Sequence, residues 1–184
     1  MSGKDTAAAQ RYNSVAMALH WLVAALVFVL IGLGWYMTDI PRGTPERTFF
    51  YNLHKSIGFT TAFIVLFRLW WRIKYPPPPL PDTVPAWQVK ASRISHVLIY
   101  TCLIIMPVSG FSATQFTKWG LTYFELFKIP SMGPENKAIY DVLQGIHEIT
   151  SVVLVTLLLI HIIAALKHLV VDRDQVFRRM LPGK

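Results

Sequence analysis

Residues 142–171 read VLQGIHEITSVVLVTLLLIHIIAALKHLVV. This stretch is longer than the roughly 20 apolar residues that an α-helix needs to cross the hydrocarbon core of a bilayer. Its histidines His147 and His161 are 14 residues apart. At about 100° and 1.5 Å per residue, they lie within about 40° of one helix face and about 21 Å apart. One membrane helix therefore offers imidazoles at two depths.

Three further apolar runs are long enough to cross a bilayer, at about residues 15–37, 49–71 and 94–116. Apolar residues make up 53% of the 184 residues and charged residues only 15%, against roughly a quarter charged in soluble domains. The first run exceeds the apolar segment of a signal peptide, about 7–15 residues, so we interpret it as a retained helix. The sequence predicts an all-α integral membrane protein, a bundle of four transmembrane helices that forms a single domain over residues 1–184.

The distribution of basic residues predicts the orientation of this bundle. With the N-terminus in the cytoplasm, twelve Lys and Arg residues fall on the cytoplasmic side and six on the outer side. Because Lys and Arg concentrate in cytoplasmic loops, we expect both termini there. The net charge of +8 is then explained without nucleic acid as a partner. The single cysteine, Cys102, excludes a disulfide within the chain and metal sites built from several cysteines.

Histidines are the main candidate functional residues of the spans. Six lie within or at the edges of these segments: His20, His54, His96, His147, His161 and His168. An ionisable side chain at membrane depth is costly and suggests function, although one histidine alone can serve a helix–helix hydrogen bond. Two imidazoles that face each other across a bundle suit the axial positions of haem iron, whereas zinc and copper sites commonly add Cys or carboxylate ligands. The chain has no Cys-x-x-Cys-His motif, so we expect non-covalent b-type haem used for electron transfer.

Depth in the membrane predicts which histidines pair. His54 and His147 each lie about 7–8 Å inside the outer ends of their spans, so they form a natural outer pair. His20 lies about five residues inside the cytoplasmic end of the first span. Its partner is one of three residues: His161, His168 or His96. We prefer His161, which lies furthest inside the apolar span, and the other two remain alternatives.

Haem propionates need cationic or polar partners, and the sequence offers them near both pairs. Arg68, Arg72 and Lys74 at the end of the second span are candidates for the inner haem. Lys55, beside His54, is the candidate for the outer haem. The alternative for each residue is that its charged end extends to the lipid headgroups.

Several short motifs resemble those of the bacterial cytochrome b561 family, in the same order and over almost the whole chain. The motifs are Arg11-Tyr12-Asn13, Leu19-His20-Trp21-Leu22, Leu53-His54-Lys55-Ser56-Ile57-Gly58, Arg72-Ile73-Lys74-Tyr75-Pro76, Ser95-His96-Val97-Leu98-Ile99-Tyr100, Pro107-Val108-Ser109-Gly110, His147-Glu148 and the segment from His161 to His168. The resemblance implies four helices in the bacterial inner membrane and two bis-His b haems. The axial ligands that it implies are His20, His54, His147 and His161.

Some members of that family are superoxide oxidases, which take an electron from superoxide outside and reduce ubiquinone near the cytoplasmic side. The resemblance therefore implies superoxide and membrane quinone as redox partners. It also implies that His96 and His168 lie near the inner haem, with His168 as a neighbour of the quinone.

Superoxide is an anion, and positive potential would steer it to its site. The outer loops carry six basic and five acidic residues, a net charge of only 6 − 5 = +1. Arg42, Arg47, Lys118 and Lys128 could nevertheless form a local positive patch in these loops. We take Arg47 and Lys118 as candidate catalytic residues. Some relatives carry a lysine close to the equivalent of His147, where this chain reads Leu143-Gln144-Gly145-Ile146.

Two other functions are compatible with the same residues. In the first alternative, the chain is a membrane anchor subunit that passes electrons between a dehydrogenase or hydrogenase and quinone. In a different class, the histidines form a proton relay in a channel or transporter. A relay does not need pairs of histidines at matched depths on different helices, which favours the haem interpretation.

Overall fold

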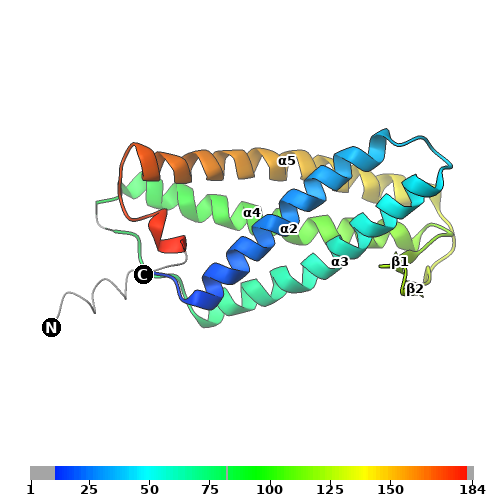
Figure 1. Cartoon of the computed structure of the whole chain (residues 1–184), viewed down its shortest axis with the longest axis horizontal. Helices are drawn as coiled ribbons and strands as arrows, with labels where there is room; N and C mark the ends of the chain where they lie inside the picture. The colour runs from blue at the N-terminus through cyan, green and yellow to red at the C-terminus, as the bar shows by residue number, and fades with distance from the viewer. Residues whose placement is uncertain (1–10, 82, 182–184) are drawn as a thin grey trace.

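The computed structural model describes residues 11–81 and 83–181 and is built from long helices (Figure 1). Its elements are α2 (Ser14–Asp39), α3 (Pro45–Lys74), α4 (Ala86–Gln115), β1 (Leu121–Tyr123), β2 (Phe127–Ile129), α5 (Lys137–Val170) and the 3₁₀ helix η1 (Arg178–Met180). The four α-helices are all long and apolar enough to cross a membrane. The predicted four-helix membrane bundle is thereby confirmed.

Helices α3, α4 and α5 begin earlier than hydropathy indicated, and in α3 and α5 a side chain caps the first turn. Thr44 caps α3 by accepting a hydrogen bond from the Arg47 amide, and Pro45 occupies the first turn, where its missing N–H costs nothing. Asn136 caps α5 in the same way through the Ile139 amide. Helix α4 begins at Ala86, eight residues before the expected span, directly after Pro85.

The helices form two adjacent pairs. Helix α2 packs along α3 and α4 packs along α5, and α3 also contacts α4. The starts of α2 and α4 lie at the same end as η1, which we call the η1 end (Figure 1). The opposite end carries β1 and β2, and we call it the hairpin end. Each pair is antiparallel, as short connections between neighbouring helices require.

The bundle has small and polar residues inside and large apolar residues outside. The buried apolar centre consists of five residues: Val23, Val27, Val65, Cys102 and Leu154. Large side chains such as Phe28, Phe63 and Ile163 are more than half exposed. This arrangement suits a lipid surround, where exposed apolar surface costs nothing and small residues let helices approach closely.

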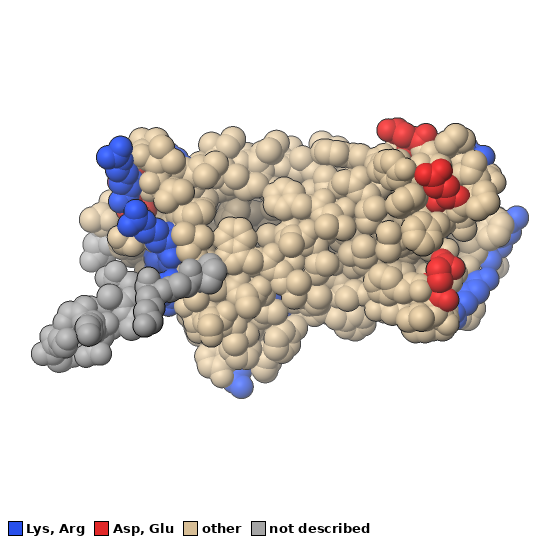
Figure 2. Space-filling model, viewed as in Figure 1, with Lys and Arg blue, Asp and Glu red and all other residues tan. Residues whose placement is uncertain are grey.

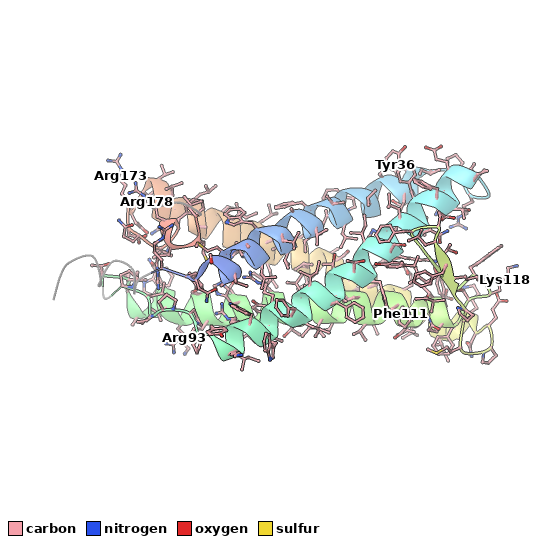
Figure 3. The ribbon with its side chains drawn as sticks, turned by 60° about the horizontal axis from the view of Figure 1, so that its bottom comes forward. Tyr36, Arg93, Phe111, Lys118, Arg173 and Arg178 are labelled. Atoms are coloured by element: carbon pink, nitrogen blue, oxygen red, sulfur yellow. The ribbon has the colours of Figure 1, made fainter. Side chains whose placement is uncertain are left out.

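The charged side chains on the surface lie toward the two ends of the bundle. Figure 2 shows a wide uncharged middle, with Lys and Arg at both ends and the largest acidic clusters toward the hairpin end. Arg93, Arg173 and Arg178 extend at the η1 end, and Lys118 extends at the hairpin end (Figure 3). The uncharged middle is the part that a bilayer would surround.

The connection between α4 and α5 contains a short antiparallel hairpin that the sequence did not indicate. Strands β1 and β2 pair Leu121 with Ile129 and Tyr123 with Phe127. Gly120, at φ 65°, permits the hairpin because a Cβ atom there would lie 2.6 Å from the Ile129 carbonyl oxygen. Leu121 is 1% exposed, so the hairpin covers the end of the bundle.

Ser56 on α3 fixes this hairpin to the helices. Its side chain is 0% exposed. The hydroxyl lies 2.7 Å from the Asn52 carbonyl and 3.2 Å from the Thr122 carbonyl, and it accepts a hydrogen bond of 2.9 Å from the Phe124 amide. A single buried hydroxyl therefore satisfies backbone groups of the hairpin that no water would reach.

The chain after α5 returns to the start of the chain at the η1 end. Arg11 donates to the Leu181 carbonyl at 2.5 Å, and Trp21 Nε1 donates to the Met180 carbonyl at 2.8 Å. Arg179, 3% exposed, donates to the carbonyl of Pro78 in the proline-rich connection. Burial lowers the pKa of the Arg179 guanidinium, with nearby Tyr12 opposing the shift. The η1 segment thus ties both connections of this end together.

Replacing Ser56 by Ala should loosen the hairpin, because the Phe124 amide loses its buried acceptor. We expect a loss of about 1–2 kcal/mol in the free energy of unfolding in detergent and faster hydrogen exchange of the amides of residues 121–129. The matched control is Ser151→Ala, since the Ser151 hydroxyl bonds only within its own helix, to the Glu148 carbonyl. Equal behaviour of the two variants would contradict the role given to Ser56.

Candidate functional site

Two histidine pairs span the bundle, one toward each end. At the hairpin end, His54 on α3 faces His147 on α5, with ring centroids 6.3 Å apart and planes at 75°. At the η1 end, His20 on α2 faces His161 on α5, with ring centroids 6.4 Å apart and planes at 65°. Helix α5 contributes one imidazole to each pair because residues 14 apart return to nearly the same face of a helix.

The separation within each pair suits one metal ion between two imidazoles. A metal–imidazole bond is about 2 Å long, so two such bonds and the distance from each nitrogen to its ring centre add up to about 6 Å. Both pairs match this separation. His96 on α4 lies closer to His161, at 5.4 Å between centroids, in an edge-to-face contact that leaves less room for an ion. The structure therefore brings His96 beside the η1-end pair as a packing neighbour.

Met106, Ser109 and Gly110 on α4 form a socket that orients His147. Its Nδ1 lies 2.9 Å from the Met106 carbonyl oxygen and 3.4 Å from the Ser109 hydroxyl. Gly110 makes this approach possible, because a Cβ atom there would lie 3.1 Å from Cε1 and Nδ1 of the imidazole. With Nδ1 engaged by a carbonyl, Nε2 is the ring nitrogen that would be available to a metal.

A cavity of about 260 Å³ adjoins the hairpin-end pair, and both His54 and His147 line it. Gly34, Gly58 and Gly110 border the same region, and a Cβ atom at Gly34 would lie 3.6 Å from His54 Cε1. His54 Nδ1 is buried and has no hydrogen-bond partner among the described residues. Space beside two imidazoles, together with a buried polar atom lacking a partner, fits a planar cofactor better than a closed polar contact.

Lys55 is the cation that lines this cavity. Its Nζ lies 3.3 Å from the Gly120 carbonyl oxygen. The described residues contain no ion pair to Lys55. A lysine held this way presents positive charge to whatever occupies the cavity.

Arg68 on α3 makes three polar contacts beside the η1-end pair. Its Nη2 lies 3.1 Å from His20 Nδ1, its Nε donates to the Tyr100 hydroxyl at 3.0 Å, and its Nη1 donates to the Ala16 carbonyl at 3.3 Å. A small cavity of about 20 Å³ lies beside Arg68 and Arg72 and is not lined by either histidine of the pair. The sequence predicts either a propionate or the lipid headgroups as the partner of Arg68, and the structure shows a contact with His20 instead. An arginine within an apolar span was the signal for this contact.

Among the described residues, the other two cations expected near the inner haem make no hydrogen bond to His20 or His161. The Arg72 guanidinium is 5.9 Å from the centre of the Tyr100 ring. Lys74 Nζ stacks over Trp70 and Tyr75, at 5.2 and 5.6 Å from the ring centres. Such stacking is typical of basic side chains at the level of the lipid headgroups.

The structure places both candidate catalytic cations, Arg47 and Lys118, outside the lining of the hairpin-end cavity. Arg47 donates to the carbonyls of Thr38 and Ile40 and to the Tyr51 hydroxyl, so it closes the turn between α2 and α3. Lys118 Nζ lies 4.9 Å from the centre of the Trp119 ring and extends away from the bundle (Figure 3). The number of basic residues in a loop does not show whether a given charge holds the loop together or faces a cavity.

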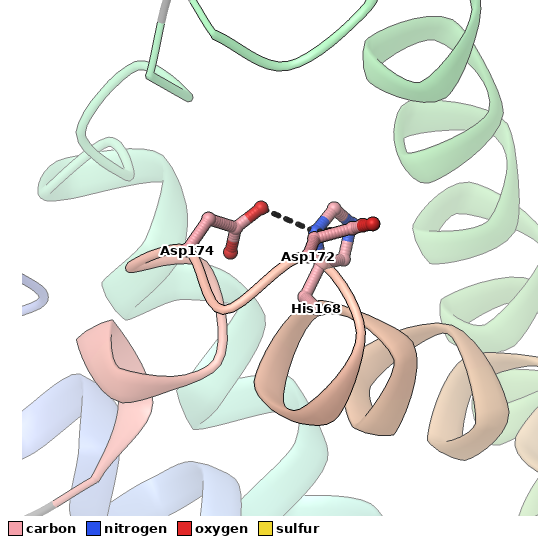
Figure 4. A group of neighbouring side chains, drawn as sticks. All are labelled: His168, Asp172 and Asp174. Atoms are coloured by element: carbon pink, nitrogen blue, oxygen red, sulfur yellow. Dashed lines mark hydrogen bonds and ion pairs between the residues drawn. The ribbon is translucent and has the colours of Figure 1, made fainter.

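His168 belongs to a separate cluster beyond the end of α5. Its Nδ1 lies 2.6 Å from an Asp174 carboxylate oxygen and 3.3 Å from one of Asp172 (Figure 4). Asp172 also pairs with Lys167 at 2.5 Å. The three ligand atoms lie within 4.8 Å of one another. These contacts satisfy His168 locally, and the described residues show no ring contact between it and either pair.

Comparison with known proteins agrees with this architecture. Residues 11–183 match the family described as prokaryotic cytochrome b561. Cytochrome b561 homolog 2 of Escherichia coli K12 is 30% identical, with 94% of this chain and 92% of the relative covered. Cytochrome b561 homolog 1 of the same organism is 25% identical over 95% of this chain and 98% of the relative. A protein named probable superoxide oxidase CybB, from Yersinia pestis, is also 25% identical, with the same two shares covered.

The match extends over nearly the whole chain, including all four helices and both histidine pairs. Membership in this family implies b-type haem, which suits paired imidazoles without nearby cysteine ligands. The chain therefore belongs to the prokaryotic cytochrome b561 family of membrane electron-transfer proteins.

Proposed function

We propose that this chain is a di-haem b-type cytochrome that oxidises superoxide at the hairpin end and reduces ubiquinone near the η1 end. The proposal is carried by two pairs of facing imidazoles, His54–His147 and His20–His161. In each pair the distance between the rings suits one iron ion. Haem bound by two histidines changes oxidation state without changing ligands, which suits single-electron relay. Four residues of this chain would then serve as axial ligands.

We place the η1 end in the cytoplasm of a bacterium, at the inner membrane. Ten of the described basic residues lie at the η1 end: Arg11, Arg68, Arg72, Lys74, Lys90, Arg93, Lys167, Arg173, Arg178 and Arg179. Six lie at the hairpin end: Arg42, Arg47, Lys55, Lys118, Lys128 and Lys137. This excess supports a cytoplasmic η1 end with both termini on that side. The hairpin end then faces the periplasm.

The superoxide step rests on one relative's name and on Lys55. The relative from Yersinia pestis is named a probable superoxide oxidase. An anion that approaches the hairpin-end pair meets Lys55 in the cavity lining, whereas Arg47 and Lys118 act from the rim by long-range attraction. We therefore propose Lys55 as the closest cation for superoxide or for a haem propionate, with Arg47 and Lys118 in steering roles.

The quinone step is proposed at the η1 end. His96 touches His161, and its Nδ1 lies 2.7 Å from the carbonyl of Ser92 on its own helix. His168, held by Asp174, lies beyond the same end of α5. Both histidines are able to carry a proton to a reduced quinone, while Arg72 and Lys74 remain available for haem propionates.

Haem content tests the proposal directly. A pyridine haemochrome assay on the purified protein should give two haems per chain, and His147→Ala should give one, because the hairpin-end pair loses a ligand while His20 and His161 remain. Reduced-minus-oxidised spectra should show the visible bands of bis-His haem. One haem in the unaltered protein would remove one of the two sites, and no haem would refute the function.

Gly110→Ala should selectively damage the hairpin-end site. The added methyl group would lie 3.1 Å from the His147 ring and push it out of its socket on α4. We expect haem content to fall from two per chain toward one. Gly145→Ala is the matched control, since a Cβ atom at Gly145 meets nothing within 4 Å. Retention of both haems with unchanged spectra in Gly110→Ala would show that the socket does not orient the ligand.

Stopped-flow mixing with superoxide tests the donor. Superoxide should reduce the haems at a rate that falls with rising salt, and Lys55→Gln should slow this rate by roughly tenfold, within the range of electrostatic steering. Lys137→Gln is the control, because Lys137 is exposed and already pairs with Asp141. If dithionite reduces the haems and superoxide does not, the superoxide step is wrong while the haem sites stand.

A further inference from the structure

The two histidine pairs differ in what touches their Nδ1 atoms. At the hairpin end, His147 Nδ1 lies 2.9 Å from a neutral carbonyl oxygen, that of Met106. At the η1 end, His20 Nδ1 lies 3.1 Å from the Arg68 guanidinium. A guanidinium only donates, so the contact with Arg68 needs an unprotonated Nδ1 on His20. One candidate iron ligand therefore faces an acceptor dipole, and the other lies beside a full positive charge.

The charge on Arg68 is not neutralised by its contacts. Its other partners are the Tyr100 hydroxyl and the Ala16 carbonyl. The described residues contain no ion pair to Arg68. An arginine in a protein stays protonated at any ordinary pH, so the charge persists in every protonation state of His20.

The acidic residues within the helices all lie at the other end of the bundle. They are Asp39 at the end of α2, Glu46 at the start of α3, and Asp141 and Glu148 in the first turns of α5. Helix α4 contains no acidic residue. Arg72, one turn beyond Arg68, adds a further cation near Tyr100. Outside the helices, Asp172 and Asp174 lie at the η1 end, where they pair with Lys167 and His168. Lys55 lines the hairpin-end cavity, and its Nζ lies 3.3 Å from the Gly120 carbonyl oxygen. The two ends therefore differ in what contacts the imidazole: at the η1 end a guanidinium touches a ring nitrogen directly.

We propose that Arg68 directs electron flow by raising the reduction potential of the haem held by His20 and His161 above that of the haem held by His54 and His147. This inference rests on the proposed di-haem function. A ferric haem carries one positive charge more than a ferrous haem, so a fixed cation beside its ligand disfavours the oxidised state. The effect is large where water is excluded and screening is weak.

At the hairpin end, the contact of His147 should lower the reduction potential instead of raising it. When Nε2 of His147 faces the metal, its Nδ1–H donates to the Met106 carbonyl, and such a bond increases the basicity of a ligand. A more basic ligand stabilises the oxidised state and lowers the reduction potential. With haem bound at both pairs, the two contacts would favour transfer of one electron from the hairpin-end haem to the η1-end haem. The quinone would receive its electrons from the second haem.

Redox titration of the full-length protein, followed by visible absorbance, tests this role. Arg68→Gln should lower one of the two midpoint potentials and leave the other in place. We expect at least a tenfold change in the equilibrium between the two haems, which is 59 mV for a one-electron couple. Arg68→Lys keeps the charge and should shift that potential by less than half as much. In His147→Ala, which keeps only the η1-end ligand pair, Arg68→Gln should produce the same shift.

Arg93→Gln is the matched control for loss of one positive charge at the same end, because Arg93 is exposed and extends away from the bundle (Figure 3). Its shift should be less than half that of Arg68→Gln. Equal shifts in the two arginine variants, an equal shift of both haems, or no shift in Arg68→Gln would overturn the inference. Loss of the haem from Arg68→Gln would also overturn it, since Arg68 would then act by holding a propionate.

Failure of the inference and failure of the proposed function give different results. The haem content of each sample is measured before titration. Two haems per chain with no effect of Arg68→Gln would refute the role of Arg68 alone. Fewer than two haems in the unaltered protein would refute the di-haem function itself, whatever the potentials.

Discussion

Water is absent from the hydrocarbon core of a membrane, so a polar side chain there must find its partner on another helix. In this bundle the partners of the polar groups are specific. Met106 on α4 receives His147 from α5, and Arg68 on α3 reaches both His20 on α2 and Tyr100 on α4. These contacts join helices that apolar packing alone would leave free to slide, because lipid tails are as apolar as leucine.

The same constraint explains which residues are small. Gly110 faces the His147 ring closely, and Gly34 faces His54. A Cβ atom at Gly110 would crowd the His147 ring at 3.1 Å, whereas one at Gly34 would lie 3.6 Å from His54, an ordinary van der Waals contact. Buried hydroxyls such as Ser56 and Ser109 bond to backbone carbonyls and do not add a competing charge. The interior is therefore shaped around imidazoles, with its aliphatic residues concentrated at the centre between the two pairs.

The two ends of the bundle differ in charge for two separate reasons. Loop residues at the η1 end are basic, which is the usual pattern for cytoplasmic loops. Arg68 lies inside the helical bundle and contacts a histidine, which orientation alone does not require. The first asymmetry supports the orientation proposed for the chain in the membrane. The second acts at the distance of a hydrogen bond, where an electric charge affects the chemistry of a bound metal.

The sequence by itself determined the four helices, because apolar runs of spanning length have few alternatives in a bilayer. It also indicated that α5 carries imidazoles at two depths, since helical periodicity fixes His147 and His161 on one face. Tertiary structure alone decided which of the nearby histidines faces His161, that His168 turns to Asp174, and that Arg47 closes a turn. Helix rotation and side-chain reach set these contacts, and neither is encoded in hydropathy or in spacing along one helix.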